Sequence, residues 1–245
     1  MEEGGCERNP KTIPGGRWSG HGVGPVGWAW GNCRCGSGTQ VDEYSLRVDY
    51  SVREFGPFRL RTRTYNSSLP GPLMVTRPGH TLHVKLMNHL PADPPALAPA
   101  GVDPLNNPHA FNTTNLHTHG LQVIPHLFQP LGTSNPAAPS NPAAPMIGLQ
   151  SGQSLGYVFK LPKDHPSGLY WYHPHYHGSA AVQVVNGMAG LILIKGPVDD
   201  VPEIAAAHDE LLAIQNIKLN PLDRGAVNAP AARHVRIMKA YLTTV

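Results

Sequence analysis

Histidine is the residue type whose number and spacing point most directly to chemistry. The chain of 245 residues contains 14 histidines. Seven fall between positions 117 and 177, and most of these lie in two short segments, TNLHTHG (114–120) and WYHPHYHG (171–178). Imidazole is a good ligand for copper, zinc, iron and nickel. The two segments therefore predict a metal site, although the ligand type alone does not identify the metal.

The histidines within each segment stand two residues apart. In a β-strand, residues i and i+2 point to the same face, with Cβ atoms about 6.6 Å apart. This distance is too long for close chelation of one ion in regular strand geometry, but it suits two imidazoles that serve neighbouring ions. A lone His-x-His is more often a polar strand face. Two such units on neighbouring strands would bring four or five imidazoles together, and we therefore predict a small polynuclear site.

The composition limits the kinds of structure that could position these residues. Glycine and proline contribute 26 residues each, and helix interiors tolerate neither. Hydrophobic residues, at 40%, are sufficient for a core, and no apolar stretch reaches the 18 or so residues that a membrane span needs. A formal charge of +3 without interleaved aromatic residues argues against nucleic-acid binding. The sequence thus predicts a turn-rich, mostly β protein.

Alternation of apolar and polar residues predicts the individual strands. In the segment 80–88, Leu82, Val84 and Leu86 share one face and polar residues occupy the other, which is typical of a β-sandwich. Five further segments show strand patterning: 43–50, 58–65, 153–161, 168–178 and 182–196. The apolar run at 191–194 within the last of these indicates a buried strand.

The remaining segments are expected to lie outside the main domain or on its surface. Residues 1–41 resemble a disordered, glycine-rich leader that contains all three cysteines and no convincing signal peptide. The tandem repeat SNPAAPSNPAAP at 134–145 cannot enter a central strand and is expected to form a surface loop. Residues 198–245 are expected to form a linker and a partial second domain, with a first strand at 209–217.

Two segments together resemble the N-terminal copper motifs of the multicopper oxidases, the laccase-like family. They are TNLHTHGLQV (114–123) and GLYWYHPHYHGSAAVQVVNGMAGLILI (168–194). The resemblance extends over residues 44–197. It implies a cupredoxin-type Greek-key β-sandwich at 42–197, copper as the cofactor, and O2 and a small reducing substrate, a phenol or a metal ion, as partners. It also implies an extracellular or periplasmic location.

The resemblance also assigns roles to individual histidines. His117 would be a ligand of the type 2 copper ion, and His119, His173 and His175 would bind the type 3 copper pair. His177 matches a third histidine that occurs in some family members without an assigned ligand role. We expect it to support the site or the fold.

The sequence departs from the family pattern in two respects. The family holds a type 1 blue copper with a cysteine in a His-Cys-His segment, whereas the last cysteine here is Cys35, and only four of the eight histidines of the trinuclear cluster are matched. Acidic residues that could relay protons are also missing between Asp103 and Asp164. Asp164 itself is expected to form a turn.

These departures leave two interpretations open. The chain would be the N-terminal half of an oxidoreductase, apparently truncated early in its second domain and inactive alone. Missing C-terminal domains or a second chain would then supply the other ligands. Alternatively, it would be a copper-binding or interaction module without catalysis of its own.

Residues around the motifs have structural interpretations. Trp171 and Tyr170 are expected to pack beneath the histidines and orient them. Asn115 is expected to help form a turn where the motif strand opens, and Met188 is assigned to the core rather than to an axial copper ligand. His80 is expected to meet solvent.

Overall fold

The computed structural model describes residues 40–55, 58–94, 108–132, 145–208 and 210–217. The predicted leader at 1–41 lies outside the described residues except at its end, where the first strand begins at Val41. The repeat at 134–145 is described only at its last residue, and the predicted second domain only as far as residue 217.

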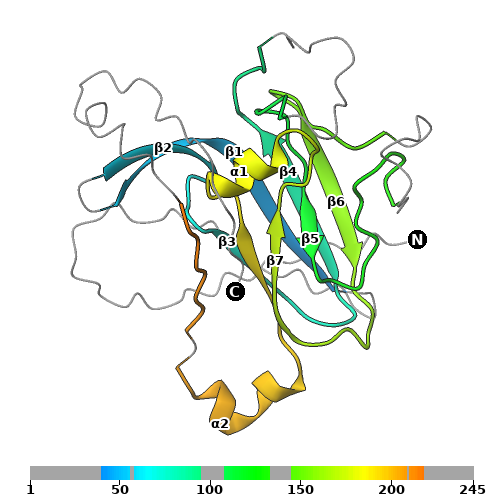
Figure 1. Ribbon diagram of the computed structural model, residues 1–245. Coiled ribbons are helices and arrows are strands. Elements are labelled where there is room, and N and C mark those ends of the chain that lie inside the picture. Colours follow the sequence, from blue (N-terminus) through cyan, green and yellow to red (C-terminus); the bar gives the residue numbers. More distant parts are fainter. Residues whose placement is uncertain (1–39, 56–57, 95–107, 133–144, 209, 218–245) are drawn as a thin grey trace, which may run out of the picture.

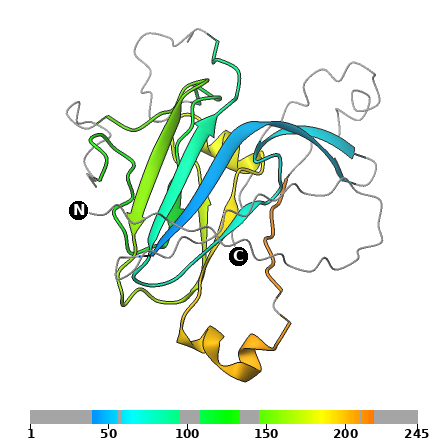
Figure 2. The same ribbon diagram turned by 180° about the vertical axis from the view of Figure 1, so that it is seen from behind.

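The described residues form two four-stranded sheets (Figure 1, and from behind Figure 2). One sheet has the order β2-β1-β4-β6 and consists of β1 (Val41–Phe55), β2 (Phe58–Tyr65), β4 (Thr81–Asn88) and β6 (Ser154–Lys160). The other has the order β3-β8-β7-β5 and consists of β3 (Gly71–Thr76), β5 (His117–His119), β7 (Gly168–His173) and β8 (Gly190–Ile194). The predicted all-β, cupredoxin-type sandwich is confirmed.

Strand pairing is mixed, because β1 runs parallel to β4 and β3 runs parallel to β8. The other pairs are antiparallel. Parallel neighbours cannot be joined by a tight turn. The chain therefore crosses between the sheets to reach them, as in a Greek-key arrangement.

The core lies between the sheets and follows the predicted alternation. Leu82, Val84 and Leu86 of β4 are at most 1% exposed, as their shared face predicted. Opposite them, the second sheet buries Met74, Tyr172 and Ile192. Met188 is also completely buried in this core, in agreement with its structural assignment.

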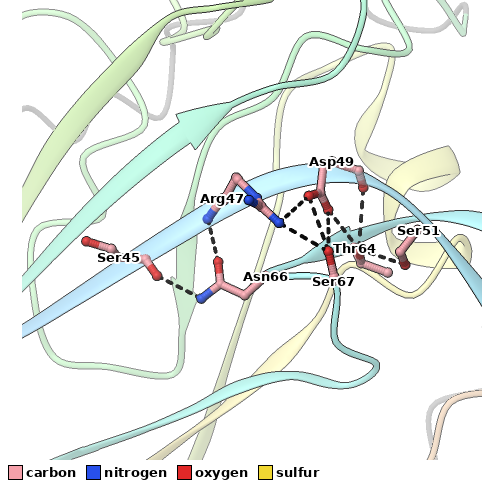
Figure 3. A network of polar contacts seen from close by, with 7 residues as sticks. All are labelled: Ser45, Arg47, Asp49, Ser51, Thr64, Asn66 and Ser67. Carbon is pink, nitrogen blue, oxygen red and sulfur yellow. Dashed lines mark hydrogen bonds and ion pairs between the residues drawn. The ribbon is translucent and has the colours of Figure 1, made fainter. Parts of the chain in front are cut away.

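In the tight turn after β2, side chains form hydrogen bonds to β1 (Figure 3). Asn66 and Ser67 both have left-handed backbone angles, φ 52° and 53°, a conformation that asparagine tolerates better than most residues. The Asn66 amide accepts a hydrogen bond from the Arg47 N–H at 2.6 Å and donates one to the Ser45 carbonyl at 2.9 Å. An ion pair of 2.8 Å between Arg47 and Asp49 lies beside it. The Asn66 backbone N–H also donates to the Arg47 carbonyl at 2.7 Å, so the backbone and the side chain of Asn66 together extend the pairing with β1 where β2 ends.

The segment after the second histidine motif differs from its prediction. The predicted strand at 182–196 is wrong in its first part, because Ala180–Val185 form the helix α1 and β8 begins only at Gly190. Gln183, in the middle of α1, is fully buried and accepts a hydrogen bond from Thr114 Oγ1 at 2.8 Å. Tertiary contact thus overrides the strand preference of the valines in this segment.

The histidine that follows the turn at Gly79 also differs from its prediction. His80 Nδ1 lies 2.9 Å from Asp42 Oδ2, and its side chain is only 17% exposed. Thr76 donates a hydrogen bond to the same carboxylate oxygen at 2.7 Å. The solvent-facing role expected for His80 is therefore wrong, because Asp42 draws the ring to the start of β1.

Beyond the sandwich the chain forms two short helices, η2 (Pro197–Asp200) and α2 (Pro202–Ala205), which project away from both sheets (Figures 1 and 2). The strand predicted at 209–217 is not formed among residues 210–217, because no described strand pairs with this segment. Leu212 and Ile214 are 76% and 96% exposed there. None of the described helices has the length and apolar character that a membrane crossing requires.

Candidate metal centre

The strands β5 and β7 bring the two histidine segments together. Their antiparallel register places His117 opposite His173 and His119 opposite Trp171. Between these pairs, Thr118 and Tyr172 lie opposite each other, and both are buried. Since side chains alternate between the faces of a strand, the histidines of both strands project from the opposite face, away from the core.

Four of the predicted ligands converge on this face. The potential ligand nitrogens of His117, His119 and His173 all lie within 4.8 Å of one another. His175 joins them, since its ring centroid is 5.1 Å from that of His117 and 6.1 Å from that of His173. The structure therefore gathers the four histidines that the sequence singled out, while their role as ligands remains a prediction.

Burial keeps three of these imidazoles, those of His117, His173 and His175, neutral. It lowers the pKa of His117 to about 3, with the neighbouring His173, His175 and His119 lowering it further. Burial likewise lowers the pKa of His173 to about 4 and also lowers that of His175. A neutral imidazole has one nitrogen with a free lone pair. These three side chains are thus in the protonation state that metal binding requires.

One hydrogen bond identifies the free nitrogen of His173. Its Nδ1 lies 2.9 Å from the carbonyl oxygen of Pro174. A carbonyl oxygen can only accept, so Nδ1 carries the proton and Nε2 has the lone pair. That Nε2 faces His119 Nδ1 at 3.3 Å.

This geometry fits a bound transition metal. Two imidazole nitrogens that bind one tetrahedral ion at about 2.0–2.1 Å are about 3.3–3.4 Å apart, which matches the separation of the His119 and His173 nitrogens. The Nδ1 atoms of His117 and His175 are buried without a hydrogen-bond partner, a costly arrangement for a polar atom. Imidazole nitrogens gathered in this way, two of them without a partner, suit copper or zinc.

Trp171 packs against two of the predicted ligands. Its ring stacks on His173 with centroids 4.2 Å apart and on His119 at 4.9 Å, with interplanar angles of 28° and 26°. The sequence prediction that Trp171 orients the imidazoles agrees with these contacts. Tyr170 lies on the opposite face of β7 from Trp171 and donates a hydrogen bond to the Pro166 carbonyl at 3.0 Å.

His177 is placed differently from the other four. Its ring centroid lies 5.8 Å from that of His175, and it is not in the group whose nitrogens lie within 4.8 Å of one another. Its backbone N–H donates to Met146 Sδ at 3.4 Å. The contact ties the turn before α1 to the neighbouring loop and agrees with a supporting role.

His165 is a structural histidine that the spacing pattern did not distinguish. It is 3% exposed, accepts the Gln122 N–H on Nε2 at 3.0 Å, and donates from Nδ1 to the Pro166 carbonyl at 2.8 Å. Both ring nitrogens are therefore used. The side chain joins the segment that follows β5 to the turn that precedes β7. Asp164, beside it, is exposed in that turn.

A buried arginine supports the loop that leads into β5. Arg63 donates to Asn112 Oδ1 at 2.8 Å and to Asn186 Oδ1 at 3.0 Å, and it is 9% exposed. Arg61 lies on the Tyr50 ring at 3.9 Å and remains exposed. The alternating arginines of β2 thus have different roles: Arg63 joins the β5 loop to the end of α1, and Arg61 faces solvent.

Known proteins resemble this chain over the same region. The family model described as multicopper oxidase matches residues 101–199. Laccase-1 of Thanatephorus cucumeris is 28% identical over 169 residues, which covers 69% of this chain and 24% of that protein. The multicopper oxidase mco of Staphylococcus haemolyticus is 26% identical over 153 residues, which covers 62% of this chain and 26% of that protein.

A solved structure also aligns with this chain. The multicopper oxidase from Campylobacter jejuni, described as a metallo-oxidase, matches with a TM-score of 0.45 and 25% identity, covering 64% of this chain and 26% of that one. The present chain thus spans about a quarter of the length of the curated relatives named above.

Proposed function

The chain belongs to the multicopper oxidase family, and from this premise we propose that its sandwich is the first domain of a laccase-like oxidoreductase. In this proposal His117 serves the type 2 copper ion, and His119, His173 and His175 serve the type 3 pair. The observation that carries the proposal is the convergence of imidazole nitrogens from β5 and β7 within 4.8 Å.

Copper bound here would supply the one-electron chemistry with which the family reduces O2 to water while oxidising a small reducing substrate such as a phenol or a metal ion. The residues of this chain gather four imidazoles at one face, and burial keeps those of His117, His173 and His175 neutral. The Pro174 carbonyl holds the proton of His173 on Nδ1. Trp171 packs against His119 and His173 and shields that side of both rings from water.

The proposal requires ligands from outside this sequence. Four histidines are half of the set that a trinuclear cluster uses, and the last cysteine of the sequence is Cys35. Further domains or a second chain would complete the cluster and supply the type 1 site. An extracellular or periplasmic location belongs to the same proposal. The isolated chain is expected to bind copper without turning over a phenol, which is also what a copper-binding module without catalysis would do.

Copper affinity and coordination test the proposal. The measurement uses a variant in which Cys6, Cys33 and Cys35 are serine, because thiolates bind Cu(I) strongly. We expect competition with a chromophoric Cu(I) chelator to show binding that weakens at least tenfold in His119→Ala and in His173→Ala. X-ray absorption should show imidazole scattering and no copper–sulfur shell.

His83→Ala is the matched control, because this half-exposed histidine lies on β4, outside the cluster. Its copper affinity should equal that of the parent protein. Equal affinities in all three variants, or a copper–sulfur shell in the cysteine-free protein, would overturn the ligand assignment.

A second experiment distinguishes an enzyme domain from a copper-binding module: the chain is mixed with the C-terminal domains of a laccase. Phenol oxidation that needs His119 and His173 favours the enzyme, and its absence favours the module.

A further inference from the structure

The ladder between β5 and β7 stops just before it reaches His175. The register pairs His117 with His173, so its continuation would place Asn115 opposite His175. Pro174 intervenes, and a proline has no N–H to contribute to a ladder. Backbone pairing therefore ends at His173, and His175 lies beyond the last strand residue.

The side chain of Asn115 takes the place of the missing backbone partner. It is completely buried. Its Oδ1 accepts the His175 N–H at 2.7 Å, and its Nδ2 donates to the Ile147 carbonyl at 3.1 Å. One amide thus joins the start of the TNLHTH segment, the second histidine segment and the loop at residue 147.

The segments on either side of the Asn115 amide are held by their own hydrogen bonds and burial. Thr114 and Leu149 exchange two backbone hydrogen bonds of 3.0 and 2.7 Å, and Ile147 is 2% exposed. Asn66 offers a partial parallel in the same molecule, because its side-chain amide accepts the Arg47 N–H where β2 ends, beside a backbone hydrogen bond from its own N–H to the Arg47 carbonyl. The contact to His175 therefore comes from a rigid support.

His175 depends on this contact because its ring has little else to orient it. The Nδ1 atom is buried without a hydrogen-bond partner in another residue, and among the described residues the ring contacts only the imidazoles of His117, His173 and His177. The position of its backbone then decides where the imidazole points, 5.1 Å from the ring of His117.

We propose that Asn115 is a positioning residue for His175: its side-chain amide replaces the interrupted ladder and sets the location of this imidazole in the metal centre. The inference rests on the proposed function, since it takes His175 as a copper ligand. Hydrogen-bonding groups behind a metal ligand typically change metal affinity 10–100-fold when they are removed.

The test compares Asn115→Leu with Asn88→Leu in the cysteine-free background. Asn88 is an equally buried amide that donates to the carbonyls of Asn112 and Leu149 and accepts the Leu90 N–H. We expect both variants to lose stability in denaturant unfolding of the metal-free protein. Only Asn115→Leu should also lose copper affinity, by about 10–100-fold.

A second comparison uses His175→Ala. If Asn115 acts through His175, Asn115→Leu should cause no further loss of copper affinity once His175 is alanine. Additive losses, or an Asn115→Leu variant with unchanged affinity, would overturn the inference. Unchanged affinity in His175→Ala alone would instead show that the proposed ligand set is wrong. Should a leucine variant fail to fold, Asn115→Ser and Asn88→Ser are compared by the same criteria.

Discussion

The Nδ1 atom of His119 and the Nε2 atom of His173 face each other at 3.3 Å across two antiparallel strands. In a neutral His173 whose Nδ1 proton is held by Pro174, that Nε2 offers a lone pair. The two residues come from motifs 54 positions apart in the chain. If both residues are copper ligands, as proposed above, their nitrogens would serve the same ion.

A double-mutant cycle tests this shared ion. His119→Ala and His173→Ala should each weaken copper binding, and the double variant should weaken it by less than the sum, with a coupling of about 0.5–3 kcal/mol. Competition with a Cu(I) chelator in the cysteine-free background measures each affinity. A cycle that pairs His173→Ala with His83→Ala serves as the control and should be additive. Strict additivity in the first cycle would show that the two histidines do not share an ion.

Trp171 should report copper binding through its fluorescence, because its ring stacks 4.2 Å from His173 and 4.9 Å from His119. Cu²⁺ is expected to quench part of the emission, while Zn²⁺, which has no redox chemistry, should quench less. Trp171→Phe, which keeps an aromatic ring, should abolish the quenchable part. Quenching that survives in Trp171→Phe would place the copper elsewhere.

The stability of the metal-free protein should depend on pH through the cluster. The folded-state pKa values of His117 and His173 are lowered to about 3 and about 4, from about 6.5 for a free histidine. Between these values the unfolded chain binds more protons, so stability is fully present above about pH 6.5 and declines as the pH falls.

Urea unfolding between pH 5 and 7 measures this effect above the range where most carboxylates titrate. The slope of the unfolding free energy against pH should fall when His117 and His173 are both replaced by glutamine. The same slope in parent and variant would contradict the burial of these two rings as neutral groups.

Removal of the Arg63 side chain should destabilise the fold. Arg63→Met removes the buried donor of Asn186 Oδ1 and leaves Asn112 Oδ1 with only the Tyr50 hydroxyl, and we expect a loss of about 2–4 kcal/mol in the free energy of unfolding. Arg61→Met, which removes an exposed stack on Tyr50, should cost about 0.5–1 kcal/mol. Guanidinium unfolding curves compare the two, and equal losses would contradict the structural role of Arg63.

Much of the architecture follows from patterns within single segments. The alternation of Leu82, Val84 and Leu86 predicted which face of β4 is buried. The spacing of the histidines predicted two strands that bring them together, and β5 and β7 do so, although the strand predicted at 168–178 ends at His173 and His175 lies beyond it. These inferences succeed because side-chain direction in a strand has a period of two residues.

Features that depend on distant partners did not follow from those patterns. VQVV reads as strand, yet Gln183 inside it is buried against Thr114 in a helix. His80 looked exposed until Asp42, 38 residues earlier, was found beside it. Asn115 looked like a turn residue, since the contact to His175 arises only once the register of β5 and β7 is known and Pro174 interrupts it. In the sequence, only Pro174, between His173 and His175, indicated that the strand pairing would be interrupted here.

The parallel pairing of β3 with β8 has a consequence for the order of events during synthesis. Residues 71–76 find their partner only when residues 190–194 have left the ribosome, and such distant pairing is slow to form. Until then, β7 lacks its neighbour β8, and the sheet that positions the histidines of β5 and β7 is incomplete. Copper that is present early would meet loose imidazoles rather than a shaped site, so correct metal loading should follow closure of the sheet.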